Sequence, residues 1–312
     1  MQKPPKHIVS SSDISKEGYD EIVRRTGKFI KEGISPDLCR GKVVATLFFQ
    51  PSTRTMNCFQ SAMIRAGGGW IGVMGEKGLS MEKGESFEDT IREYGNFADC
   101  IVLRHPDDDS AERAARVSRV PIINGGSGSR EHGVAVAMVL GHLINYLKKP
   151  MSKCKFGIYG TPEINRVTKA MVPILGLYGI DLVIDDLGYF PLPKEIEERA
   201  RKNGIKSLRY DKLENFIGDV DVLFLTRGLQ KGIIPPDKFP KEKEELILKS
   251  YKPITTEHMK KMKKDAILFM LKPRIFEVDT AVDDDPRAIY TKPEPYVEEA
   301  LAVMTYLLNI KA

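Results

Sequence analysis

The stretch VVATLFFQPSTRT, residues 43–55, changes character at its proline. The seven residues before the Gln-Pro pair are apolar or β-branched and predict a buried strand, which the proline ends. Four polar residues follow directly: Ser52, Thr53, Arg54 and Thr55. Apolar spacing after them predicts a helix that begins near Ser52 or Thr53, with open N–H groups in its first turn. Hydroxyls, N–H groups and a guanidinium at one turn suit an anion such as phosphate, although a plain cap with a solvated arginine is the alternative. No GxxxxGK[ST] pattern is present, so this turn is not a nucleotide P-loop.

The same alternation of apolar runs and helical patterns continues along the chain. The other short apolar runs span 70–75, 100–105, 120–125, 155–160, 181–186, 207–210, 220–227 and 266–271. Runs of this kind predict parallel strands covered by helices on both faces. We therefore expect an α/β fold with two parallel sheets, in domains that span residues 1–148 and 149–290. Residues 134–150 predict a long helix that ends at Pro150 and bridges the halves, and residues 235–246 predict a loop.

Composition limits the class of protein. The chain has 312 residues, 42% hydrophobic and 29% charged, with a net charge of +5. This is ordinary globular composition without a basic tract, so neither a nucleic-acid partner nor a membrane span is predicted. The four cysteines lie far apart and form no CxxC. They indicate buried free thiols rather than a metal site or a redox pair, and we expect a soluble cytoplasmic protein.

Polar side chains follow several of the predicted strands directly. They are Arg104 and His105, residues 127–132, Arg166, and Arg227. Because ligands bind at the carboxyl ends of parallel strands, these residues are candidates for a binding site. For His105 we expect a structural role, with a hydrogen bond to the neighbouring backbone.

Six stretches carry a resemblance to a known family. In order they are FFQPSTRTMNCFQSAMIRAGGGWIGV (48–73), SMEKGESFEDTI (80–91), IVLRHP (101–106), PIINGGSGSREH (121–132), VDVLFLTRGLQK (220–231) and KPRIFEVDTAVDDDPRAIY (272–290). Together they resemble the aspartate/ornithine carbamoyltransferase family, and the last two are similar to its aspartate branch. The resemblance implies a two-domain carbamoyltransferase fold whose C-terminal helix, residues 291–312, returns to the first domain.

The family reaction is attack by an amine on the carbonyl carbon of carbamoyl phosphate, with phosphate as the leaving group and no cofactor. The resemblance implies phosphate binding by Ser52, Thr53, Arg54, Thr55 and Arg104. It also implies that Thr55, Arg104 and His132 polarise the carbonyl group. Ser80 and Lys83 are expected to complete the site from an adjacent chain, which implies at least a homotrimer.

The acceptor side is assigned in the same way. Arg166 and Arg227 are expected to bind the two carboxylates of aspartate. Gln230 is expected to add a contact, although an extra residue blurs that alignment. Leu271 and Lys272 lie in the loop that presents backbone carbonyls to the substrate. For Arg166 alone, a solvated position on the first turn of a helix is the alternative.

Three segments of the chain depart from the family pattern. Ala135 stands where the family has a glutamine that binds the carbamoyl amine, Leu271 and Lys272 replace a Pro-Leu pair, and Gln50 replaces a frequent glutamate. These departures leave three functions open. One is carbamoyl transfer to aspartate, the second is carbamoyl or related acyl transfer to another carboxylated amine, and the third is a noncatalytic or regulatory paralogue. A regulatory partner chain also remains open.

A dinucleotide-dependent oxidoreductase is the remaining alternative. GIYGTPEINR (157–166) follows a predicted strand and opens a helix, and acidic residues end the next strand. The GxGxxG fingerprint is missing from this stretch, which disfavours the alternative.

Overall fold

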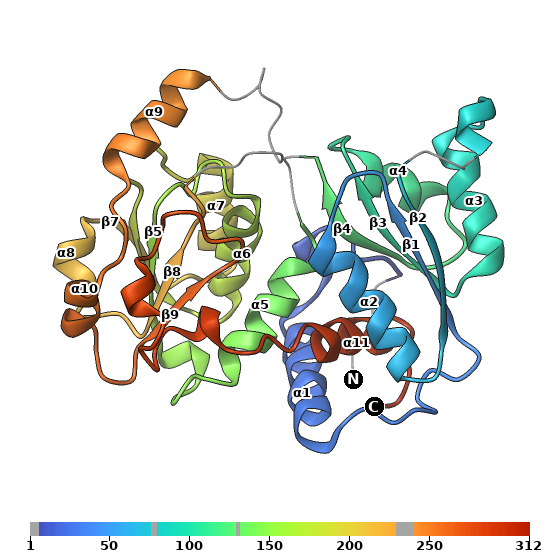
Figure 1. Cartoon of the computed structure of the whole chain (residues 1–312), viewed down its shortest axis with the longest axis horizontal. Helices are drawn as coiled ribbons and strands as arrows, with labels where there is room; N and C mark the ends of the chain where they lie inside the picture. Colours follow the sequence, from blue (N-terminus) through green and yellow to red (C-terminus); the bar gives the residue numbers. More distant parts are fainter. Residues whose placement is uncertain (1–5, 76–79, 129–131, 229–239) are drawn as a thin grey trace. The chain divides into compact units, whose positions relative to one another are not determined.

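The computed structural model describes residues 6–75, 80–128, 132–228 and 240–312 (Figure 1). The chain divides into two compact units. Unit 1 comprises Met1–Asn145 and Pro295–Ala312, and unit 2 comprises Tyr146–Glu294.

Unit 1 is built from one sheet and its covering helices. Its strands are β1 (Val43–Phe48), β2 (Gly69–Met74), β3 (Cys100–His105) and β4 (Ile122–Ser127). Its helices are α1 (Lys16–Glu32), α2 (Thr53–Arg65), α3 (Phe87–Phe97), α4 (Ser110–Val117), α5 (Ala135–Ile144) and α11 (Tyr296–Leu307), with 3-10 helices η1 (Ser11–Asp13) and η2 (Ser80–Lys83).

The sheet of unit 1 is parallel, with the strand order β2-β1-β3-β4. Side chains alternate between its two faces. On one face Leu47 and Leu103 pack with Phe87 in a core that α3 and α4 complete. On the other face α2 lies against β1, where Gln60 Nε2 donates a hydrogen bond of 2.8 Å to Thr46 Oγ1. Helices therefore cover both faces, and this explains why β1 and β3 are apolar almost throughout.

The C-terminal helix α11 belongs to the helical layer of unit 1. It packs against α1, α2 and α5, and Figure 1 shows it in red among these helices. Its residues from Glu299 to Leu307 are all buried. The last part of the chain therefore completes the core of unit 1.

Unit 2 has the second sheet. Its strands are β5 (Lys155–Tyr159), β6 (Asp181–Asp185), β7 (Ser207–Tyr210), β8 (Val222–Leu225) and β9 (Ile267–Met270). Its helices are α6 (Arg166–Leu177), α7 (Lys194–Lys202), α8 (Leu213–Phe216), α9 (Lys241–Ser250) and α10 (Thr256–Lys261), with 3-10 helices η3 (Met151–Lys153), η5 (Thr280–Val282) and η6 (Ile289–Thr291).

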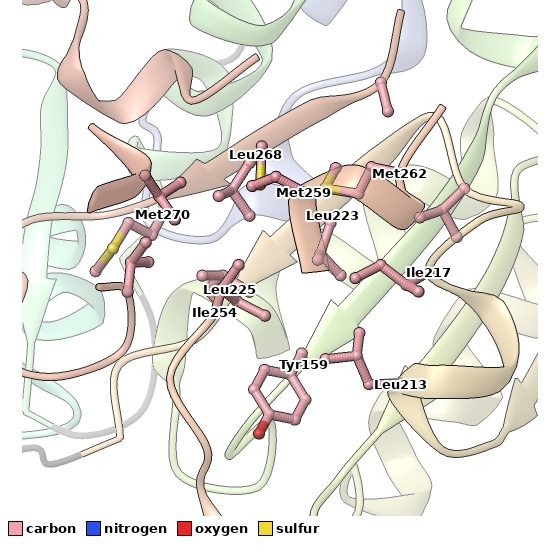
Figure 2. Packing of buried hydrophobic residues seen from close by; sticks show 14 of the residues in the cluster. Tyr159, Leu213, Ile217, Leu223, Leu225, Ile254, Met259, Met262, Leu268 and Met270 are labelled. Atoms are coloured by element: carbon pink, nitrogen blue, oxygen red, sulfur yellow. The ribbon is translucent and has the colours of Figure 1, made fainter. Parts of the chain in front are cut away.

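This sheet is also parallel, with the order β7-β6-β5-β8-β9. Leu223 and Leu225 contribute to one buried cluster, which Figure 2 shows together with Tyr159 and Leu268. Phe224, which lies between the two leucines, contacts the Phe269 ring of the next strand at a centroid distance of 5.7 Å. Both faces of the sheet are therefore covered, and the predicted α/β class is confirmed.

Each predicted apolar run contains a strand, but two predictions about helices are wrong. The helix predicted for residues 134–150 ends at Ile144, because the Asn145 amide Nδ2 donates to the Gly141 carbonyl at 2.8 Å and stops the last turn. The loop predicted for residues 235–246 is helical from Lys241 onward, since α9 begins directly after Pro240. Proline fits the start of a helix, and acidic residues in the first turn of α9 stabilise its N-terminus.

The four cysteines are buried and free, as predicted. Burial raises the pKa of Cys39 and of Cys154 to about 11, and that of Cys100 to about 12. Burial also raises the pKa of Cys58. No described helix combines the length and the apolar composition that a bilayer-crossing segment needs.

Candidate active site

The carboxyl ends of β1, β3 and β4 bring three sequence-predicted segments to one edge of the sheet in unit 1. Phe48 of β1 pairs with Arg104 of β3, and the Phe49 N–H donates to the Arg104 carbonyl at 2.8 Å. On the other side of β3, His105 pairs with Ser127 of β4. The turn after β1, the end of β3 and the loop after β4 therefore leave the sheet at the same edge.

The turn after β1 is open to solvent. Ser52 is the N-cap of α2, yet its side chain accepts no capping hydrogen bond from the described residues. Thr53 and Arg54 in the first turn of α2 are exposed. Arg54 forms no ion pair with any described carboxylate. N–H groups, hydroxyls and a guanidinium thus remain available at a helix N-terminus.

Arg104, unlike the exposed Arg54, is buried. It is 9% exposed, and its Nη1 donates to the Gly125 carbonyl at 3.2 Å. Its Nε is buried and has no hydrogen-bond partner within the part of the chain that the structure describes. Burial lowers the pKa of Arg104 from its ordinary value, but an arginine stays protonated near neutral pH. A buried cation with an unused donor is costly, and this cost is offset when an anion binds.

Gly125 links Arg104 with the turn after β1. Its carbonyl accepts from Arg104, and a Cβ at this glycine would lie 3.4 Å from Thr55 Cγ2 and 3.2 Å from the Leu103 carbonyl. Only a residue without a side chain allows this approach without displacement of the neighbours. Thr55 and Arg104 are therefore brought together through Gly125.

His132 precedes α5 and is 8% exposed. Its carbonyl accepts from the Ala135 N–H at 3.0 Å, and the next turn is tied to β4 because the Val134 N–H donates to the Asn124 carbonyl at 3.3 Å. The Asn124 side chain also donates to Ser127 Oγ at 3.0 Å and accepts from the Gly126 N–H at 2.8 Å. Sequence reasoning missed Asn124; a polar residue inside an apolar strand was the available signal.

His105 has the structural contact expected for it. Its Nδ1 accepts from the Asp107 N–H at 3.1 Å, and its ring lies 4.9 Å from the Phe49 ring and 5.0 Å from the Phe87 ring. The histidine therefore supports the turn that follows Arg104.

Ser80 and Lys83 form the ends of η2, and both are exposed. Lys83 has no ion-pair partner among the described carboxylates. The Glu85 N–H donates to the Ser80 carbonyl at 3.2 Å, which closes this turn ahead of α3. An exposed ammonium without a described counterion is available to a ligand or to another chain.

In unit 2, Arg166 and Arg227 follow the neighbouring strands β5 and β8. Thr161 ties the two loops together: its N–H donates to Thr226 Oγ1 at 2.5 Å and its hydroxyl donates to the Arg227 carbonyl at 2.9 Å. Arg166 opens α6, which Asn165 caps, and it is 7% exposed. The alternative of a solvated Arg166 is therefore wrong, because the residue is buried in the first turn of α6.

Glu277, which sequence reasoning also missed, connects the segment after Arg227 with the loop after β9. Its carboxylate is fully buried and accepts from the N–H groups of Gly228 at 2.9 Å, Ile275 at 2.7 Å and Phe276 at 3.1 Å. Three N–H donors on one carboxylate fix the backbone of both segments.

The loop after β9 is held at a second point. Arg274 pairs with Asp283, whose Oδ1 also accepts from the Tyr290 hydroxyl at 2.8 Å. The Arg274 guanidinium lowers the pKa of Asp283, and burial raises that of Tyr290. Much of the family-like signature in residues 272–290 therefore acts as scaffold.

Leu271 and Lys272 lie directly after β9, and the Lys272–Pro273 peptide is cis. The Lys272 ammonium lies 3.0 Å from Glu294 Oε1, so this cation has a carboxylate partner within unit 2. That ion pair was not predicted. Gln230 falls outside the described residues.

One more ion pair braces the loop that leads to Arg166. Lys243 Nζ donates to both carboxylate oxygens of Glu163, at 2.7 Å and 2.9 Å. The first turn of α9 is therefore attached to the segment that precedes α6.

Comparison with known proteins identifies the family. The model for "Aspartate/ornithine carbamoyltransferase, carbamoyl-P binding domain" matches residues 6–136. The aspartate carbamoyltransferase catalytic subunit of Thermococcus kodakarensis is 34% identical over 289 residues, which covers 91% of this chain and 90% of that protein. The corresponding subunit of Clostridium botulinum (strain Eklund 17B) is 34% identical over 312 residues, 98% of each chain.

Solved structures agree with this result. The catalytic subunit of M. jannaschii aspartate transcarbamoylase superposes with a TM-score of 0.84 at 33% identity, over 97% of this chain and 98% of that one. Trypanosoma cruzi aspartate transcarbamoylase in complex with carbamoyl phosphate gives a TM-score of 0.85 at 26% identity, over 99% and 97%. These relatives are transferases, which disfavours the dinucleotide-dependent alternative. The chain therefore belongs to the aspartate/ornithine carbamoyltransferase family and is a transferase of its aspartate carbamoyltransferase branch.

Proposed function

We propose that this protein transfers the carbamoyl group of carbamoyl phosphate to the amino group of L-aspartate, a step of pyrimidine biosynthesis. The products are N-carbamoyl-L-aspartate and phosphate. The observation that carries the proposal is the buried Arg104 guanidinium, which is fixed on the Gly125 carbonyl at the same sheet edge as the open first turn of α2. Support also comes from the T. cruzi relative, whose structures contain carbamoyl phosphate, or aspartate with phosphate.

On the donor side, the phosphate binds the first turn of α2 and two guanidinium groups. The binding residues are Ser52, Thr53, Arg54, Thr55 and Arg104, with Ser80 and Lys83 from an adjacent copy. Fixed N–H groups and cations stabilise the dianion without reorganisation during the reaction. Thr55, Arg104 and His132 polarise the carbonyl oxygen, where negative charge develops when the amine attacks.

The transfer needs no activation beyond the donor's own anhydride bond. The amine nitrogen forms a bond with the carbonyl carbon, a tetrahedral intermediate results, and the bond from this carbon to the phosphate oxygen breaks. The nitrogen gives up one proton, which leaves with the phosphate. Protein groups therefore contribute position and charge.

On the acceptor side, the two arginines of unit 2 bind the carboxylates of aspartate. Arg166 and Arg227 suit this role because their loops are joined through Thr161 and because guanidinium groups bind carboxylates in a bidentate manner. Leu271 and Lys272 contribute through the loop after β9, and Gln230 is assigned by the family match alone.

A second candidate is transfer to a different carboxylated amine. The observation that favours it is Ala135, a methyl side chain at the first position of α5 directly after the His132 turn. A methyl group makes no hydrogen bond, and one neutral hydrogen bond contributes about 0.5–1.5 kcal/mol. A loss of that size weakens donor binding several-fold without abolishing turnover.

The test is a turnover assay on the purified full chain with carbamoyl phosphate and a panel of amino acids and amines. We expect phosphate release with L-aspartate and formation of N-carbamoyl-L-aspartate, both abolished in Arg54→Ala. Release with another amine and none with aspartate would establish the second candidate. Phosphate binding without release for any amine would establish the noncatalytic paralogue.

The same assay tests the shared site. We expect Arg54→Ala and Lys83→Met proteins to be inactive separately and to regain part of the activity when their chains are mixed and reassembled. In a mixed trimer some sites combine an intact Arg54 from one chain with an intact Lys83 from another. A monomer by light scattering, or no recovery on mixing, would remove Ser80 and Lys83 from the site.

A further inference from the structure

The two side chains of the Lys272–Glu294 ion pair differ in their exposure to solvent. Lys272 Nζ lies 3.0 Å from Glu294 Oε1. The Glu294 side chain is 4% exposed, whereas that of Lys272 is 38% exposed. The carboxylate is therefore the desolvated member, and a buried carboxylate is costly without a nearby cation. Lys272 supplies that cation.

The pair joins two distant segments of unit 2. Lys272 lies in the loop after β9, next to Leu271, and Glu294 is the last residue of unit 2. Tyr146, the first residue of unit 2, lies within the electrostatic reach of Glu294, because burial and then the Glu294 carboxylate raise the pKa of Tyr146. Through its ion pair with Lys272, Glu294 thus joins the loop after β9 to the last segment of the unit.

The other cation of this loop is also compensated. Arg274 pairs with Asp283 and contacts the Tyr290 hydroxyl. Each cation of residues 271–274 therefore has a carboxylate of its own. An ammonium already held by a buried carboxylate adds little attraction for a further anionic group of a substrate.

We propose that Glu294 is a positioning and specificity-determining residue for the acceptor. It binds the Lys272 ammonium, fixes the backbone of Leu271 and Lys272, and keeps this cation from binding an anionic group of the substrate. This inference rests on the proposed function, because it takes the loop after β9 as part of the acceptor side.

The first test is a double-mutant cycle measured by steady-state kinetics. We expect Glu294→Gln and Lys272→Met each to raise KM for the acceptor about tenfold, the usual scale for loss of a partly buried charge pair, with KM for carbamoyl phosphate unchanged. The double variant should be no worse than either single variant, because both single changes remove the same interaction. The reversed pair, Lys272→Glu with Glu294→Lys, should recover acceptor KM to within about threefold of wild type.

A matched control is available on α10. Lys260 and Glu257 form an ion pair of 2.6 Å whose side chains are about 70% exposed, at 71% and 70%. Lys260→Met and Glu257→Gln remove a Lys–Glu pair of the same chemistry from the same unit. We expect both KM values to stay within about twofold of wild type, since exposed pairs contribute little.

The second test does not depend on turnover. Hydrogen exchange of the backbone amides in residues 270–274 should accelerate in Glu294→Gln and in Lys272→Met, and should not change in the α10 controls. If wild type proves inactive on aspartate while exchange accelerates, the proposed function fails and the role of Glu294 in holding the loop stands. Unchanged exchange, unchanged acceptor KM, or an equal rise in both KM values overturns the inference.

Discussion

The substitution Arg104→Met tests how a buried guanidinium group at the candidate phosphate site affects ligand affinity on the one hand and stability of the fold on the other. The substitution keeps an unbranched apolar side chain but removes the charge, the hydrogen bond to Gly125 and the buried Nε donor. We expect the variant to lose affinity for phosphate while its fold keeps its stability.

The magnitudes follow from these contacts. Removing the bond to Gly125, whose donor is charged, costs about 1.5–3 kcal/mol of unfolding free energy, but removing a buried donor that has no described partner returns about 1–3 kcal/mol. The two changes largely offset each other, so the variant without ligand should be within about 2 kcal/mol of wild type in stability. With ligand, the loss of one hydrogen bond to a charged group costs about 1.5–3 kcal/mol, which is roughly a 10- to 150-fold weaker affinity.

Two measurements check this prediction. Calorimetric titration with carbamoyl phosphate reports the affinity, and thermal unfolding with and without inorganic phosphate reports stability and its linkage to binding. Arg92→Met is the control, because Arg92 lies on α3 in the same unit with its side chain 48% exposed and paired with Asp89. Wild-type affinity in Arg104→Met would refute the assigned site. Unfolding of the variant without ligand would show that removing the buried Nε donor does not offset the lost hydrogen bond to Gly125.

Two further predictions concern stability. Gly160→Ala should lower the free energy of unfolding by about 2–4 kcal/mol in urea titrations, because Gly160 has φ +126° and a Cβ would lie 2.3 Å from Thr226 Oγ1. A variant as stable as wild type would show that neither the backbone angle nor this close approach requires a glycine. Glu21 has a pKa lowered to about 2 by hydrogen bonds from Arg24 and then Arg25. Its folded pKa lies below the ordinary value of 4.5, so its stabilisation is complete above about pH 4.5 and is lost as the pH falls toward 2. Glu21→Gln should cost about 1 kcal/mol at neutral pH after allowance for solvent screening and nothing near pH 2, and an equal difference at both pH values would contradict the assignment.

Local sequence patterns were sufficient for the strands and for the position of the residues proposed for the donor side. The run 43–49 is apolar because β1 is central in its sheet, and Pro51 ends it, so the turn at Ser52 could be placed from sequence alone. Arg104 could be placed for the same reason, since it lies at the end of an apolar run.

Features that depend on long-range contacts could not be placed in this way. Glu277 meets Gly228 across a long stretch of sequence, and Glu294 meets Lys272 only after the chain has folded back. The neighbouring sequence of an acidic residue in a charged segment does not indicate that the residue is buried. Its partner can therefore be identified only from the tertiary structure. The end of α5 was missed for a related reason: Asn145 stops the helix through its own side chain, whereas the apolar pattern continues toward Pro150.

The buried thiols make the protein convenient for site-specific labelling. All four have raised pKa values, so they are poor nucleophiles at neutral pH. A cysteine introduced at exposed Lys202, at the end of α7, would then be the preferred target for a maleimide dye. The chain's single tryptophan, Trp70 on β2, is a natural fluorescence donor in unit 1. Energy transfer from Trp70 to this dye would then involve one defined donor and one defined acceptor.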